Sequence, residues 1–62
     1  MRDPRIDPRA GDIIQIWNHI NVQVNAVDNN SIRDTCHGVD RDVVKAWWLY
    51  IMRDAKVLYA AK

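Results

Sequence analysis

Polar and apolar residues alternate along the first half of the chain with a period of two. Residues 21–27 read Asn-Val-Gln-Val-Asn-Ala-Val without a break, the pattern of a half-buried β-strand. Residues 12–17 are β-branched and aromatic, with Ile14 and Ile16 on one face, and predict a strand before it. Residues 31–36 predict a weaker third strand with Ile32 and Cys36 pointing inward.

Short polar segments separate these predicted strands. Asn18-His19 is interpreted as a tight turn, although it lacks the glycine that the best two-residue hairpin turns use. Asp28-Asn29-Asn30 is a second turn signal, because Asn tolerates positive φ and Asp bonds its own backbone. Consecutive strands joined by short turns predict an antiparallel meander.

The pattern changes to a helical period after residues 37–39, His-Gly-Val. Asp40 or Asp42 is expected to cap the helix by accepting a hydrogen bond from its first turn. The apolar stripe of this helix comprises Val44, Trp47, Trp48, Ile51 and Ala55. Residues 55–62 allow two interpretations: Leu58 extends the helical stripe, whereas Val57 and Tyr59 would alternate in a closing strand.

These elements predict one α+β domain over residues 12–62: a small curled antiparallel meander of three or four strands with one C-terminal helix packed on it. Residues 1–11 are expected to form an extended amino-terminal arm. Asp3-Pro4-Arg5 recurs as Asp7-Pro8-Arg9, and each proline pushes the preceding Asp out of the helical region. The arm is either a stiff lead-in or a docking arm that presents Arg2, Arg5 and Arg9 to an acidic surface.

Chain length and residue types argue against an enzyme. Sixty-two residues hold one core, and a domain of this size rarely encloses a catalytic pocket. A single cysteine, Cys36, forms no internal disulfide and fits a reducing compartment. His19, Cys36 and His37 are too few and too scattered for a closed zinc site. We therefore expect no catalytic residues, no metal and no cofactor; a domain this small then depends either on good packing or on a homo-oligomer.

The charge balance narrows the choice of partner. Nine basic and eight acidic side chains give a formal charge of +1, so no strong field attracts nucleic acid or an anionic membrane. The longest apolar run, residues 46–52, is shorter than the roughly 20 residues of a membrane span. The amino terminus lacks the apolar core of a secretory signal. A cytoplasmic protein without a membrane partner is expected.

Protein binding is the function class that the composition favours. Interfaces concentrate Trp, Tyr, Met and Arg, and residues 47–53 supply all four. Trp47 and Trp48 are adjacent, about 100° apart on a helix, so one of them should lie at the edge of the core. We expect Trp48 and Tyr50 to be the exposed anchor. Arg41, Lys45 and Arg53 would form a charged rim around it.

Two other functions stay open. A single-stranded nucleic acid could stack its bases on exposed aromatic rings beside basic side chains. The residues available for this are Trp17, Trp48, Tyr50 and Tyr59, with Arg33, Arg41 and Lys45 for phosphates. The neighbouring acids Asp34, Asp40 and Asp42 weaken that interpretation. The second alternative is a purely structural or assembly subunit.

The first twelve residues carry a family resemblance. The string Asp-Pro-Arg-Ile-Asp-Pro at residues 3–8, followed by Gly11-Asp12, resembles the opening of short, uncharacterised bacteriophage and prophage proteins. Those proteins look like small β-rich domains that end with two tryptophans, a small residue and a valine, which Trp47, Trp48, Ala55 and Val57 echo with different spacing. The resemblance favours the closing strand after residue 55. It implies a phage setting, in which the chain binds a host protein and blocks or redirects it, with host antiviral defences among the targets.

Overall fold

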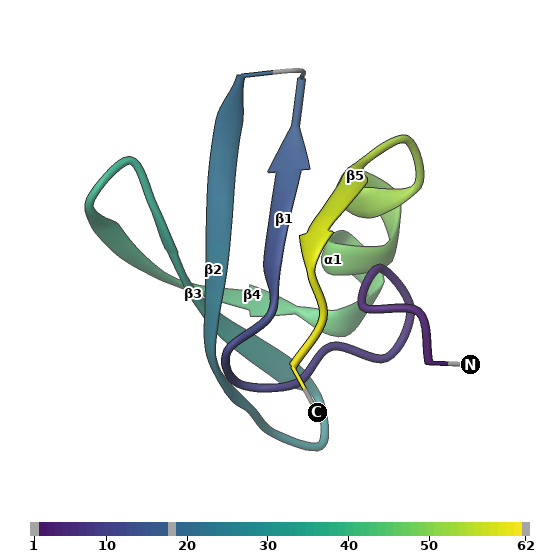
Figure 1. Cartoon of the computed structure of the whole chain (residues 1–62). Helices are drawn as coiled ribbons and strands as arrows, with labels where there is room; N and C mark the ends of the chain where they lie inside the picture. Colours follow the sequence, from purple (N-terminus) through teal and green to yellow (C-terminus); the bar gives the residue numbers. More distant parts are fainter. Residues whose placement is uncertain (1, 18, 62) are drawn as a thin grey trace.

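The computed structural model describes residues 2–17 and 19–61, which form one antiparallel sheet and one helix (Figure 1). The elements are β1 (Ile13–Ile16), β2 (Ile20–Val27), β3 (Ser31–Cys36), β4 (Val39–Val44), α1 (Lys45–Met52) and β5 (Lys56–Tyr59). The five strands are ordered β4-β3-β2-β1-β5, and every neighbouring pair is antiparallel. The predicted α+β class and antiparallel meander are confirmed.

Alternation in the sequence becomes alternation across the sheet. Along β2, Ile20, Val22 and Val24 are buried and the residues between them are exposed. The register of β2 on β3 shifts between Val24 and Ala26, and a bulge of this kind bends a strand and increases its twist. The sheet is therefore strongly curved, so that β3 and β4 cross behind β1 and β2 (Figure 1).

Residues 39–44 are a strand and not the start of the helix, which corrects the prediction that Asp40 or Asp42 caps it. His37 and Gly38 both have positive φ, 53° and 73°. They lie between the paired residues Cys36 and Val39, as the two central residues of a hairpin turn do. Histidine is not a usual residue at such a position, so the sequence pattern indicates a break there and not a hairpin turn.

Helix α1 buries fewer residues than the apolar stripe in the sequence predicts. Its first residue follows Val44, which has extended backbone and makes no side-chain cap. Trp48 and Met52 are buried, one helical turn apart, and Ile51 packs beside them. Val44 and Trp47, expected in the stripe, are exposed. The core is therefore made by one tryptophan of the adjacent pair together with the inner faces of the strands.

Strand β5 closes the sheet on β1, as the resemblance favoured, so the alternative of a longer helix is wrong. Ile14 pairs with Val57 and Ile13 with Tyr59. The chain reaches this edge by crossing from β4 through α1 (Figure 1). No helix in residues 2–17 and 19–61 is long and apolar enough to cross a membrane.

The amino-terminal segment folds against the domain, which corrects the expectation of an extended arm. The carbonyl of Asp3 accepts hydrogen bonds from the amides of Ile6 and Asp7 at 2.9 and 2.7 Å. Pro4 and Pro8 are buried. The segment passes beside α1 and β5 (Figure 1), and it is part of the packed structure.

Candidate functional site

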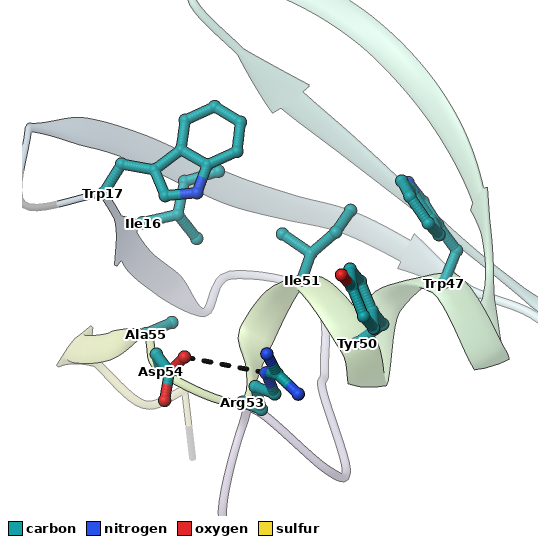
Figure 2. A pocket seen from close by; sticks show the side chains of 8 residues that line it. All are labelled: Ile16, Trp17, Trp47, Tyr50, Ile51, Arg53, Asp54 and Ala55. Carbon is teal, nitrogen blue, oxygen red and sulfur yellow. Dashed lines mark ion pairs between the residues drawn. The ribbon is translucent and has the colours of Figure 1, made fainter.

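Three of the exposed aromatic side chains, those of Trp17, Trp47 and Tyr50, gather around one cavity. Trp17, Trp47 and Tyr50 are 71%, 54% and 59% exposed. They border a concave space of about 280 Å³ between the β1–β2 turn and α1 (Figure 2). We call this space the aromatic groove; it is lined by Ile16, Trp17, Trp47, Tyr50, Ile51, Arg53, Asp54 and Ala55.

One wall of the aromatic groove is a stack of side chains on α1. The Trp47 and Tyr50 rings, three residues apart, lie nearly parallel, with centroids 5.3 Å apart and planes 14° apart. The guanidinium carbon of Arg53 lies 5.1 Å from the centre of the Tyr50 ring, a cation–π distance. The sequence places these three residues on one helical face because they recur every third position.

Trp17 forms the other wall, with Ile51 between it and the α1 stack (Figure 2). Its φ is 51°, a left-handed conformation that is a genuine outlier for a bulky residue. The carbonyl of Trp17 accepts a hydrogen bond of 2.6 Å from Nδ1 of His19. The turn predicted at Asn18-His19 is described only at His19, because Asn18 lies outside the described residues. A strained backbone residue that presents a large exposed side chain is a feature that clusters at functional sites.

The groove is close to electrically neutral. Among its described lining residues, Arg53 and Asp54 carry charge, and their Nε and Oδ2 atoms lie 3.6 Å apart. Both side chains are well exposed, so this ion pair adds little stability. It does cancel the charge at that end of the groove.

The expectation that Trp48 is an exposed anchor is wrong. Trp48 is 1% exposed and belongs to the core. Adjacent helical residues point about 100° apart, and the tryptophan that shares a face with Met52 is the one that enters the core. Trp47, and not Trp48, is the exposed tryptophan of α1. It lines the groove together with Tyr50 and Arg53, two residues of the predicted site.

The other two predicted rim residues lie away from the groove. Arg41 donates from Nε and Nη2 to the two carboxylate oxygens of Asp34, both at 3.0 Å. Asp34 is fully buried, and its hydrogen bond raises the pKa of Arg41. Arg41 therefore neutralises a buried acid and is not available as a rim residue. Lys45 is exposed at the start of α1 and does not line the groove.

The arginines of the proposed docking arm also have structural partners. Arg2 donates to both carboxylate oxygens of Asp12, at 2.6 and 3.0 Å, and to the carbonyl of Ala61. Arg5 pairs with Asp3 at 3.0 Å. Arg9 is exposed, so a docking arm of three presented arginines is not what the structure shows.

Asp12 is the buried centre that joins the two ends of the described chain. Besides Arg2, it accepts hydrogen bonds from the amides of Arg9 and Ala61 at 2.8 and 2.6 Å. Burial by itself raises the pKa of Asp12, but these bonds outweigh it and the pKa lies below its usual value. These hydrogen bonds and the ion pair with Arg2 explain why an acid occupies a fully buried position.

The adjacent thiol and imidazole of Cys36 and His37 lie in different local structures. Cys36 is half-buried at the end of β3, and His37 is exposed in the following turn. Within the part of the chain that the structure describes, no cluster of three His, Cys, Asp or Glu side chains could hold a metal ion.

The sequence does not bring Trp17 together with Trp47, because they lie thirty positions apart and only folding brings the β1–β2 turn beside α1. The position of Trp17 next to a turn was the one available signal. No protein-family model matches the chain, and no curated protein or solved structure is significantly similar to it. A proposal for the function therefore depends on the geometry of the aromatic groove.

Proposed function

We propose that the chain is a protein-binding domain that docks its partner in the aromatic groove. The observation that carries the proposal is the convergence of Trp17, Trp47 and Tyr50, all more than half exposed, on one cavity. Grouped exposed apolar side chains mark interaction sites. Trp, Tyr and Arg are the residues that most often dominate binding energy.

The arrangement suits a small, energetically concentrated contact. Trp47 and Tyr50 are held by their mutual stacking, and Arg53 by its contact with the Tyr50 ring. Such prior ordering reduces the entropy lost on binding. Ile16, Ile51 and Ala55 supply an apolar floor between the walls, on which a partner's side chain would lose its contact with water.

Charge favours a protein over a single-stranded nucleic acid. A nucleic-acid groove follows a charged backbone with several basic side chains, whereas the one described cation of this lining, Arg53, is beside Asp54 at 3.6 Å. Of the basic residues expected to hold phosphates, Arg41 is committed to Asp34.

The resemblance of residues 3–12 to phage and prophage proteins extends the proposal to the setting. The partner is then a protein of the bacterial host, met in its cytoplasm, and occupation of the groove blocks or redirects that protein.

The test compares three forms of the tagged protein as affinity baits in a bacterial lysate, with quantitative mass spectrometry of what each retains. Trp47→Ala should reduce capture of a specific host protein at least about 30-fold, the equivalent of a 2 kcal/mol hot spot. Val39→Ala removes an equally exposed side chain of β4 that does not line the groove, and should capture as the unchanged protein does. Equal capture by the Trp47→Ala and Val39→Ala forms would contradict the proposal.

A further inference from the structure

We infer that the aromatic groove takes a proline-rich segment of the partner in the polyproline II conformation. This inference rests on the proposed function and specifies the chemistry of the partner at the same site. It follows from the size of the groove, the character of its walls and its charge.

The groove has room for only a few side chains. Its volume of about 280 Å³ lies just under the range of about 300–1,000 Å³ found for pockets that hold a small-molecule ligand. Two aromatic walls, Trp17 on one side and the Trp47–Tyr50 stack on the other, leave a hollow between them (Figure 2). A hollow of this size accommodates a few side chains of a linear segment.

The chemistry of the walls distinguishes among the modes of linear recognition. Addition of a β-strand uses the unpaired backbone of a sheet edge, but the walls here are side chains of a turn and a helix. An amphipathic helix needs an apolar groove that spans several of its turns. A polyproline II segment has no internal hydrogen bonds, keeps its backbone in water and docks proline rings against aromatic side chains. The aromatic groove offers those surfaces.

Charge complementarity points to the same occupant. Arg53 and Asp54 cancel each other at 3.6 Å at one end of the groove, and the rest of the described lining is uncharged. A neutral lining matches an uncharged proline-rich segment and gives no advantage to a strand that carries a phosphate on every nucleotide. Because the segment is already extended before binding, a small contact area suffices.

The tryptophans supply the readout. Trp17 and Trp47 are exposed in the groove whereas Trp48 is buried, so a change in tryptophan emission on titration reports groove occupation. The probe is a capped decaproline peptide, with a capped peptide of equal length in which alternate prolines are alanine as its control. We expect saturable binding of decaproline at least about 10-fold tighter than of the control. Trp47→Ala and Trp17→Ala should each abolish the difference, and Val39→Ala should preserve it.

The outcomes separate this inference from the proposed function. Absence of decaproline binding, while host-protein capture still depends on Trp47, overturns the polyproline segment and leaves the protein-binding groove. If capture is independent of Trp47 as well, both are overturned. Binding of a decathymidine strand that weakens steeply with salt, without decaproline binding, assigns the groove to nucleic acid. A concentration-dependent mass in sedimentation that Trp47→Ala reduces to that of a monomer assigns it to a second copy of the chain.

Discussion

Trp47 lies at the surface and Trp48 in the core, so replacement by alanine should have different effects at these two adjacent positions. Trp48 is 1% exposed and Trp47 is 54% exposed. Trp48→Ala should therefore destabilise the fold severely, whereas Trp47→Ala should leave it nearly intact and affect binding.

The magnitude follows from the area that Trp48 removes from water. A buried tryptophan covers about 150–250 Å², which at roughly 25 cal/mol per Å² is about 4–6 kcal/mol, an upper bound because unfolded chains bury part of that area. Measured Trp→Ala losses in cores are about 3–5 kcal/mol. At about 0.05–0.15 kcal/mol per residue, a chain of 62 residues has roughly 3–9 kcal/mol of total stability. The substitution removes a large part of it.

The Nε1 atom of Trp48 refines the prediction. It is buried without a hydrogen-bond acceptor among residues 2–17 and 19–61, and a buried donor left unpaired costs about 1–3 kcal/mol. Trp48→Phe removes that donor and keeps an aromatic ring. It should therefore cost clearly less than Trp48→Ala.

Urea unfolding followed by circular dichroism measures all three variants on one scale. The urea midpoint should be highest for the unchanged protein and then fall in the order Trp47→Ala, Trp48→Phe, Trp48→Ala. The free energy of unfolding of Trp47→Ala should lie within about 1 kcal/mol of that of the unchanged protein. Equal midpoints for the two alanine variants would refute the assignment of Trp48 to the core and of Trp47 to the surface.

Three further substitutions and one control, Arg33→Ala, test the buried acids and the strained turn. Asp12→Ala should cost about 3 kcal/mol in urea unfolding at pH 7 because it leaves its donors unpaired. Since the folded pKa of Asp12 is lowered from 3.8, its contribution is present above that pH and lost as the pH falls through the lower folded value, so the variant should lose less stability on acidification. Arg41→Ala should lower the free energy of unfolding by about 2 kcal/mol, because it leaves Asp34 unpaired. The loss is smaller than for a fully buried pair because the Arg41 side chain is a third exposed. The control Arg33→Ala, on the exposed side of β3, should change the free energy of unfolding by less than about 0.5 kcal/mol. Trp17→Asn should raise the free energy of unfolding by about 1 kcal/mol, measured as a higher thermal midpoint, because Asn tolerates positive φ; a lower midpoint would show that packing of Trp17 outweighs the strain.

The sequence pattern predicted the parts of the fold that depend on local periodicity. The alternation of residues 21–27 placed β2 and its inward side chains, because a period of two leaves a single choice of buried face. The sequence does not predict a strand over residues 39–44, because the turn before them uses His37 at positive φ, where local rules expect Gly, Asn or Asp. One unrecognised turn thus removed a whole strand from the prediction.

The missing parts depend on contacts between distant residues. Asp34 faces inward on β3 because Arg41 on β4 neutralises it, and without that strand nothing predicts a buried acid. The groove likewise needs the β1–β2 turn to meet α1, which the closure of β5 on β1 brings about. Exposed aromatic residues could be expected from composition, but their convergence could not.

The small size of the core does not by itself account for the aromatic groove. A short chain does bury a limited share of its surface, and that alone would leave tryptophans outside at scattered positions. Here Trp17, which has φ 51°, and Trp47, which stacks on Tyr50 at 5.3 Å, line the same cavity. Trp17 thus combines a backbone conformation that costs stability with an exposed indole. The proposed binding at the aromatic groove would account for both features together.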